Sequence, residues 1–212
     1  MKTCYIFGAA EGFPQKFVRK AEDLLIAADG GFSMLQAMKI TPDIVLGDFD
    51  SLGHEPNFNG KIIKHPIRKD DTDTMLAVKT GLEMGFKRFV LYGCTGKRLD
   101  HTIANIQTLC YISSHGGRGY LCGDGFTATA VKDGSLGFKT TANGTVSVFS
   151  NETNTTGVDL KGMLFPLNNA EMNFDFPLGV SNEFIGERAE ISVKRGTVTV
   201  IWSGDLSDLE NF

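Results

Sequence analysis

Arg88-Phe-Val-Leu-Tyr-Gly-Cys-Thr-Gly-Lys-Arg-Leu-Asp-His101 passes from an apolar run, through a loop with two glycines, into a helical pattern. The uninterrupted run Phe89–Tyr92 predicts a strand covered on both faces, as in the centre of a parallel sheet. Over Thr102–Ser114, Ile103 and Ile106 share one face of the predicted helix. The stretch therefore predicts the strand, loop and helix of an α/β protein.

The same alternation extends over the first 132 residues. The predicted strands are Cys4–Phe7, Leu24–Ala27, Ile44–Leu46, Lys61–Lys64, Phe89–Tyr92 and Tyr120–Cys122. The predicted helices are Pro14–Asp23, Phe32–Lys39, Thr74–Met84 and Thr102–Ser114. Asp73 is placed to cap the third helix, and Asp100 precedes the fourth.

From about residue 135 short strands follow one another without helices. They are expected at Leu136–Lys139, Thr145–Phe149, Gly157–Lys161, Ile191–Arg195 and Thr197–Trp202. Arg195-Gly196, between two alternating runs, predicts a tight hairpin. We therefore expect an N-terminal α/β domain with a mainly parallel, Rossmann-like sheet over residues 1–134, and an all-β C-terminal sandwich domain over residues 135–212.

Composition narrows the class of protein further. The chain has 212 residues, is 42% hydrophobic and carries a formal net charge of −4. The acidic balance argues against nucleic-acid binding, which needs an excess of Lys and Arg. No apolar run approaches the length of a membrane span, and the first residues lack a signal-peptide core, so we expect a cytoplasmic protein without a membrane partner. The four cysteines have no paired spacing that would indicate a disulfide framework or a zinc site.

Acidic residues follow the predicted strands or open the predicted helices. The loops concerned are Ala28-Asp29-Gly30-Gly31, Gly47-Asp48-Phe49-Asp50-Ser51, Lys69-Asp70-Asp71-Thr72-Asp73 and Gly93–His101. Asp73 and Asp100 could each be explained as helix caps alone. In an open parallel sheet, however, these positions share one edge, where a ligand crevice forms at the reversal of strand order. The four loops are therefore expected to converge on one pocket.

The residue types in these loops suit a metal-bound phosphate. Clustered carboxylates repel one another unless a cation lies between them, and all-oxygen ligands favour Mg²⁺. Asp48 and Asp50, two residues apart, can reach the same ion. The Gly93–Gly96 loop and Arg98 offer donors to phosphate, and Lys69 adds a positive charge.

The ordered motifs resemble the thiamine pyrophosphokinase family over nearly the whole chain. The matching segments are Ala28–Gly31, Pro42-Asp43 with Gly47–Ser51, Lys69-Asp70-x-Thr72-Asp73, Gly93-x-Thr95-Gly96-x-Arg98-x-Asp100-His101 with Asn105, and Ser181-Asn182-Glu183. The resemblance implies transfer of the pyrophosphoryl group of ATP to the hydroxyl of thiamine, giving thiamine diphosphate and AMP. It also implies a homodimer, in which the C-terminal domain of one subunit completes the thiamine site of the other.

The resemblance carries specific roles onto residues of this chain. It implies that Asp48, Asp50 and Asp73 hold Mg²⁺, with Arg98 and either Asp73 or Asp100 acting in catalysis. The residues implied for ATP binding are Asp29, Gly30, Lys69, Thr72, Gly93, Thr95, Gly96, Arg98, Asp100 and His101. Those implied for thiamine binding are Phe165, Ser181 and Asn182. Lys97 and Phe165 depart from the family pattern, which commonly has glycine at the first position and Tyr or Trp at the second.

Three other functions remain open on the sequence alone. A pyrophosphokinase for another hydroxymethyl heterocycle would use the same metal site with a different acceptor pocket. A noncatalytic sensor would bind thiamine or a nucleotide without transfer, although binding alone needs fewer carboxylates. A structural protein without a small-molecule site is the third alternative.

Overall fold

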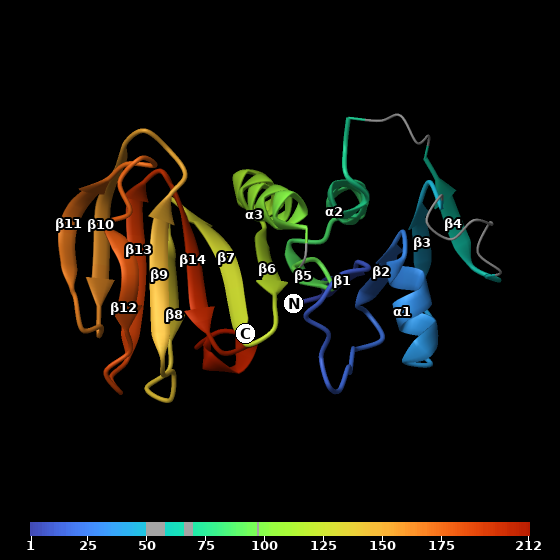
Figure 1. Cartoon of the computed structure of the whole chain (residues 1–212), viewed down its shortest axis with the longest axis horizontal. Coiled ribbons are helices and arrows are strands. Elements are labelled where there is room, and N and C mark those ends of the chain that lie inside the picture. Colours follow the sequence, from blue (N-terminus) through green and yellow to red (C-terminus); the bar gives the residue numbers. More distant parts are fainter. Residues whose placement is uncertain (50–57, 66–69, 97) are drawn as a thin grey trace.

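The computed structural model describes residues 1–49, 58–65, 70–96 and 98–212. Ten strands form one sheet in the order β12-β9-β14-β7-β6-β5-β1-β2-β3-β4, and four form a second sheet in the order β11-β10-β13-β8 (Figure 1). The strands of the large sheet are β1 (Thr3–Phe7), β2 (Leu24–Ala28), β3 (Ile44–Gly47), β4 (Lys61–Lys64), β5 (Arg88–Tyr92), β6 (Arg118–Cys122), β7 (Phe126–Lys132), β9 (Thr145–Ser150), β12 (Gly179–Glu183) and β14 (Thr197–Ser203). Those of the small sheet are β8 (Ser135–Phe138), β10 (Thr155–Lys161), β11 (Leu167–Met172) and β13 (Ala189–Arg195). The helices are α1 (Gly31–Ala37), α2 (Asp73–Glu83), α3 (Leu99–Ser114) and the short 3₁₀ helix η1 (Leu206–Asp208).

Strands β4, β3, β2, β1, β5 and β6 run parallel to one another, as the sequence predicts. From β1 the chain builds outward first through β2, β3 and β4 and then, on the other side, through β5 and β6. The strand order therefore reverses between β1 and β5. Every residue of β2 and β3 is buried, which confirms the expectation drawn from their uninterrupted apolar runs.

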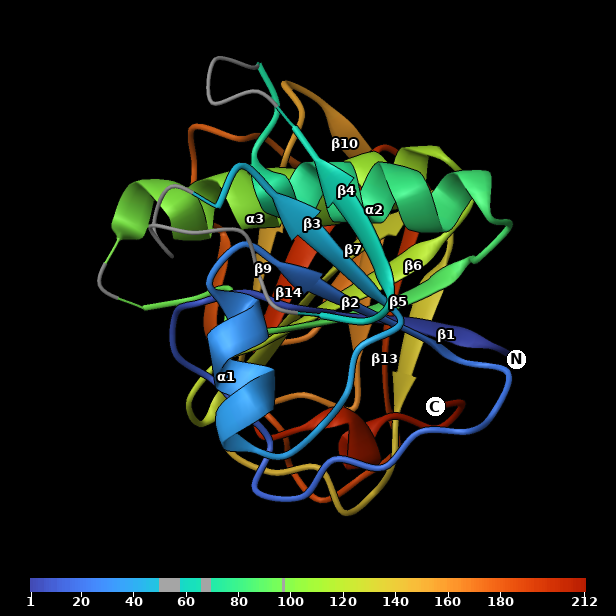
Figure 2. The same ribbon diagram turned by 90° about the vertical axis from the view of Figure 1, so that its right-hand side faces the viewer.

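Helices cover both faces of this parallel part. Helices α2 and α3 lie on one face, where Ile6 and Leu91 join their hydrophobic core (Figure 2). Helix α1 lies on the opposite face, where Phe32 and Leu35 pack with Phe7 and other residues of alternate strand positions. Within the described residues, no helix combines the length and apolarity needed to cross a membrane.

The antiparallel strands expected in the C-terminal part are present, but they do not stand apart from the α/β sheet. Strand β7 pairs with β6 on one side and with β14 on the other, so the large sheet continues through β14, β9 and β12. The small antiparallel sheet shares one hydrophobic cluster with these strands, including Phe138, Ile191 and Trp202. Strands β7, β11 and β12 were not expected from the sequence.

The predicted helix Pro14–Asp23 is wrong, because this segment is irregular. Its side chains are held individually by the sheet instead. The ring of Phe17 packs edge-on against Tyr5 at 5.0 Å and against Phe7 at 5.2 Å. The buried carboxylate of Asp23 accepts hydrogen bonds from the backbone N–H groups of Thr3, at 2.7 Å, and Lys20, at 2.9 Å. These tertiary contacts override a weak helix preference.

Two local predictions also need correction. Arg195-Gly196 does not close a hairpin, because β13 pairs with β10 and β8 in the small sheet whereas β14 pairs with β7 and β9 in the large one. The turn carries the chain between the two sheets. Helix α2 is capped by Thr72 rather than Asp73, since the Thr72 hydroxyl accepts a hydrogen bond from the N–H of Met75 at 3.1 Å.

Candidate functional site

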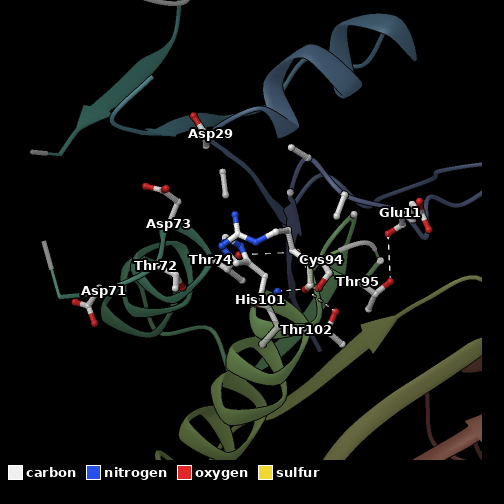
Figure 3. A pocket seen from close by; sticks show the side chains of 18 residues that line it. Glu11, Asp29, Asp71, Thr72, Asp73, Thr74, Cys94, Thr95, His101 and Thr102 are labelled. Carbon is white, nitrogen blue, oxygen red and sulfur yellow. Dashed lines mark hydrogen bonds between the residues drawn. The ribbon is translucent and has the colours of Figure 1, made fainter. Parts of the chain in front are cut away.

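A cavity of about 590 Å³ lies at the carboxyl ends of the parallel strands, beside the reversal between β1 and β5. Its walls come from the loops after β1, β2 and β5 and from the first turns of α2 and α3 (Figure 3). The lining residues are Gly8, Ala9, Ala10, Glu11, Ala28, Asp29, Asp71, Thr72, Asp73, Thr74, Gly93, Cys94, Thr95, Gly96, Arg98, His101, Thr102 and Asn105. Three of the four acidic loops singled out in the sequence thus contribute to one cavity.

Asp29 and Asp73 form the acidic side of the cavity. Asp29 follows β2 and Asp73 begins α2, and Figure 3 shows them near each other on the wall away from Glu11. Asp29 adopts a left-handed conformation with φ of 48°, which Asp tolerates better than most residues and which turns the chain sharply after the strand. Asp71 also lines the cavity, and its carboxylate pairs with the Lys79 ammonium at 2.6 Å.

The loops after β1 and β5 are joined by backbone hydrogen bonds. The N–H groups of Gly8, Ala10 and Glu11 donate to the carbonyls of Tyr92, Gly93 and Thr95, each at 2.8 Å. Gly93 has φ of +63°, and a Cβ there would lie only 2.5 Å from the Phe13 ring and 2.6 Å from the Gly8 carbonyl oxygen. Glycine at position 93 therefore allows the two loops to approach closely.

Asn105 of helix α3 holds the loop that follows β5. This side chain is 5% exposed, and its Nδ2 donates to the carbonyl oxygen of Cys94 at 2.7 Å. Burial raises the pKa of the Cys94 thiol to about 12, so the thiol is neutral at ordinary pH. Cys94 therefore contributes shape to the cavity rather than a nucleophile.

Arg98 and Asp100 form a two-pronged ion pair at the start of α3. Arg98 Nε and Nη2 donate to the two carboxylate oxygens of Asp100 at 2.9 and 2.6 Å. The guanidinium holds the pKa of Asp100 well below its usual range, which makes Asp100 a poor proton acceptor. Arg98 and His101 line the cavity, whereas Asp100 is not among the lining residues.

The remaining predicted residues are placed as follows. The half-buried Asp48 is outside the cavity lining, although its loop lies against Asp29, whose N–H donates to the Leu46 carbonyl at 2.7 Å. Gly30 is also outside the lining and precedes α1 at its N-cap position. Asp50 and Lys69 lie outside the described residues.

The carboxylates on the acidic side of the cavity fit a magnesium ion that takes most of its ligands from water and substrate phosphate. Among the described residues, no three His, Cys, Asp or Glu side chains are arranged to hold a metal. Mg²⁺ commonly uses only one or two protein carboxylates and fills its octahedron with water and substrate phosphate. Asp29 and Asp73 offer such oxygens beside the loop that is expected to hold phosphate.

The three residues predicted for thiamine lie elsewhere, around β12. Phe165 is 61% exposed, and Asn182, which is 2% exposed, holds its backbone by accepting from the Phe165 N–H at 2.9 Å and donating to the Phe165 carbonyl at 2.7 Å. The Asn182 amide is therefore committed to shaping the Phe165 turn. Ser181 is exposed, with φ of 58°.

The sequence reasoning overlooked the loop Gly8–Glu11. This loop follows a predicted parallel strand and contains a glycine and an acid, which is the same pattern that identified the other loops. Asp71, Thr74, Cys94, Thr102 and Asn105 were not assigned roles either, although each lies next to or within a motif that was quoted.

The fold and this cavity define a class: α/β proteins that bind a phosphate-bearing ligand beyond the carboxyl ends of a parallel sheet, at its reversal of strand order. The comparisons specify the family. Residues 16–120 match the model of the thiamin pyrophosphokinase catalytic domain, and residues 137–198 match that of the thiamin pyrophosphokinase vitamin B1 binding domain. The chain belongs to the thiamin pyrophosphokinase family.

Individual relatives agree with this assignment. The chain is 28% identical to a thiamine pyrophosphokinase of Bacillus subtilis over 190 residues, covering 86% of this chain and 88% of the relative. The crystal structure of thiamine pyrophosphokinase from Bacillus subtilis superposes with a TM-score of 0.83 at 26% identity, covering 97% of this chain and 100% of that one. The thiamin pyrophosphokinase of Candida albicans shares the fold, with a TM-score of 0.72 at 16% identity over 95% of this chain and 90% of its own.

Proposed function

We propose that the chain transfers the pyrophosphoryl group of ATP to the hydroxyl of thiamine, giving thiamine diphosphate and AMP. The observation that carries the proposal is the match to both family domains in order, combined with a cavity where acidic and glycine-containing loops meet. Residues 1–134, as a Rossmann-like domain, would hold ATP and metal, and residues 135–212, as a sandwich domain, would supply the thiamine side.

Phosphoryl-type transfer requires alignment and charge neutralisation more than covalent chemistry from the protein. Asp29 and Asp73, with Asp48 and Asp50 from the neighbouring loop, would hold Mg²⁺. When bound, Mg²⁺ neutralises the negative charge that builds up on the phosphate oxygens. Thr72, Arg98 and the Gly93–Gly96 loop would orient the polyphosphate.

Asp73 is the better of the two proposed proton acceptors. It lines the cavity, whereas Asp100 is occupied by Arg98 and its pKa is strongly lowered. We therefore assign to Asp73 the proton of the thiamine hydroxyl, and to Asp100 the orientation of Arg98.

The thiamine site is proposed to be shared between two copies of the chain. Strand β12 lies five strand positions from β5 in the sheet, roughly 24 Å at the usual strand spacing, and Phe165, Ser181 and Asn182 do not line the cavity of their own chain. Exposed apolar side chains concentrate in the same region. They are Leu164 (49% exposed), Phe165 (61%), Phe174 (66%), Phe176 (64%), Leu178 (43%), Val180 (46%) and Ile185 (48%). A homodimer that covers this surface would bring Phe165 of one copy to the cavity of the other.

The activity is tested by incubating the purified protein with thiamine, ATP and Mg²⁺ and separating the products by ion-exchange chromatography. We expect thiamine diphosphate and AMP together, and neither when the metal is omitted. ADP with thiamine monophosphate would indicate a simple kinase, and saturable thiamine binding without AMP would indicate a sensor. The Asp73→Asn variant should lose turnover and keep its fold, with Asp70→Asn as an exposed control from the same loop.

The shared site has its own test. Light scattering on a size-exclusion column should give a dimer, and replacing Phe174 and Phe176 by serine should give a monomer with reduced turnover. Mixing Asp73→Asn with Phe165→Ala should restore part of the activity, because a mixed dimer contains one intact site. A monomer with full activity would contradict the shared site.

A further inference from the structure

A second cavity, of about 750 Å³, lies on the face of the sheet opposite α2 and α3. Tyr5, Tyr92 and Cys122 line it from β1, β5 and β6. Tyr5 pairs with Val90, two positions before Tyr92, so both tyrosines lie on the same face of the sheet, whereas Ile6 and Leu91 belong to the core under the helices. This is the region where the helix expected over residues 14–23 does not form. The irregular segment 12–18 lines the cavity instead, together with residues 204–207 and Phe212.

Six of the residues that line this second cavity are aromatic. They are Tyr5, Phe13, Phe17, Tyr92, Phe126 and Phe212. Tyr5 and Phe17 meet at right angles with ring centroids 5.0 Å apart, and Phe17 lies 6.4 Å from Tyr92. Five of these rings are half-buried and Phe212 is exposed, and such a set suits a compact planar ligand, because aromatic pairs gain stability beyond the area they bury.

The charges around the second cavity favour a cationic ligand. Among the described residues, the charged ones that line it are Asp124, Asp205 and Lys16, which leaves one excess negative charge. The Asp205 carboxylate accepts from the N–H of Ser207 at 2.7 Å, and hydrogen bonds from the Ser207 side chain and N–H lower its pKa, so it is ionised at neutral pH. Burial raises the pKa of the Cys122 thiol to about 12, so this thiol is neutral and adds no charge to the cavity. Aromatic faces themselves attract cations.

The wall of the second cavity is continuous with the wall of the first. Residues 8–11 line the candidate active-site cavity, and residues 12–18 line the second. At the junction, the Gly93 N–H donates to the Gly12 carbonyl at 3.4 Å, and the Phe13 ring occupies the space where a Cβ of Gly93 would stand. A ligand that displaces Phe13 therefore acts directly on the loop that is proposed to orient phosphate.

We propose that the second cavity is a regulatory site for a compact aromatic cation, whose binding is transmitted through Phe13 to the Gly93–Gly96 loop. The binding itself is independent of the proposed function. The regulatory consequence rests on that function, because it requires the Gly93–Gly96 loop to take part in transfer.

The site is tested with three probes that share one ring and differ in charge: benzamidine, benzamide and benzoate. Titration into ¹⁵N-labelled protein should shift the amide signals of Gly123 and Gly125 saturably, with benzamidine binding most tightly and benzoate least. Asp124→Asn should weaken benzamidine about two- to fivefold, as expected for a partly screened charge pair, and leave benzamide unchanged. Tighter or equal binding of benzoate would overturn the assigned chemistry.

Two tryptophan variants locate the binding. Gln15→Trp places a large ring at the lining and should abolish benzamidine binding, whereas Lys20→Trp, in the irregular stretch of residues 14–23 but outside the lining, should preserve it. Benzamidine binding that survives Gln15→Trp would assign the ion to another site, such as the acidic candidate active-site cavity, and overturn the proposal.

The coupling is tested by the amides of Gly93 and Gly96 in the same titration. We expect them to shift with the same midpoint as Gly123 and Gly125. Because Phe13 is part of the wall, Phe13→Ala should weaken benzamidine binding, and it should also remove the response of Gly93 and Gly96 at concentrations that saturate Gly123 and Gly125. Shifts confined to Gly123 and Gly125 would overturn the coupling. None of these readouts uses enzymatic activity, so their failure is distinguishable from failure of the proposed function.

Discussion

Asn105 provides a sharp test of how α3 positions the candidate site. Its Nδ2 donates to the buried carbonyl of Cys94 at 2.7 Å, and Cys94 lies between the two glycines of the loop. Asn105→Ala removes the donor and leaves a buried carbonyl oxygen without this partner. We expect the loop to move away from its position in the cavity wall.

The expected loss of stability in Asn105→Ala follows from the burial of both the Asn105 side chain and the Cys94 carbonyl. An acceptor left unsatisfied in a protein interior costs about 1–3 kcal/mol, so the free energy of unfolding should fall by that amount. A displacement of about 1 Å in a group that positions substrate can lower turnover by roughly 100-fold. We therefore expect the fall in kcat to exceed what partial unfolding alone would cause.

Urea denaturation followed by tryptophan fluorescence measures the free energy of unfolding, because the single tryptophan, Trp202, is 1% exposed in the core. The rate of formation of thiamine diphosphate measures kcat. Gln107→Ala, an exposed position on the same helix, is the control and should change neither. If Asn105→Ala keeps both wild-type stability and wild-type kcat, the hydrogen bond does not position the loop and the reasoning is refuted.

Three further predictions follow from the geometry. Gly93→Ala should lower the free energy of unfolding by more than the roughly 1 kcal/mol expected for Gly116→Ala, which has a similar φ of +69° but open space around it; equal losses in urea melts would contradict the tight loop contact. Thr72→Ala should destabilise by about 1 kcal/mol through loss of the α2 cap, and a melt unchanged from wild type would show that the cap is not needed. Arg98 lowers the pKa of Asp100, so any stability from that pair is present above the usual carboxyl pKa of 3.8 and is lost as the pH falls toward the lower pKa of the folded state. The difference in the free energy of unfolding between wild type and Asp100→Asn, measured in urea melts, should therefore persist at pH 5 and shrink at pH 2–3.

The parts of the fold that could be predicted from the sequence are those in which burial leaves a local signature. Ile44–Leu46 is an unbroken apolar run because the strand is covered on both faces, and the structure confirms it as part of β3. The carboxyl ends of parallel strands lie at one edge of the sheet, and this rule alone predicts that acidic loops following different strands come together. Asp29 and Asp73 consequently meet at one cavity although 44 positions separate them in the sequence.

The parts that could not be predicted depend on partners distant in the chain. Gly8–Glu11 shows the same pattern of a strand, a glycine and an acid that identified the other loops, but its pairing with residues 92–95 through the backbone cannot be seen in side-chain identity. Residues 14–23 have a plausible helical composition, but Phe17 and Asp23 gain more from their separate contacts on the sheet. Arg195-Gly196 has the composition of a hairpin, and only the location of the partner strands shows that it links two sheets.

In the proposed shared site, the continuous sheet would give the C-terminal half a mechanical role. Strand β7 pairs with β14 along seven residue pairs, and β7 in turn pairs with β6, so the turn that carries Phe165 is connected to the cavity through hydrogen-bonded strands rather than through a flexible linker. In a dimer that covers the exposed apolar surface, the position of one copy's Phe165 relative to the other copy's cavity would then be fixed by the sheets themselves. A small change in twist at β7 or β14 would be amplified over the roughly 24 Å between β12 and β5. Substitutions in these buried central strands are therefore expected to affect the binding of thiamine even though they touch neither substrate, which distinguishes a sheet-borne shared site from two domains joined by a hinge.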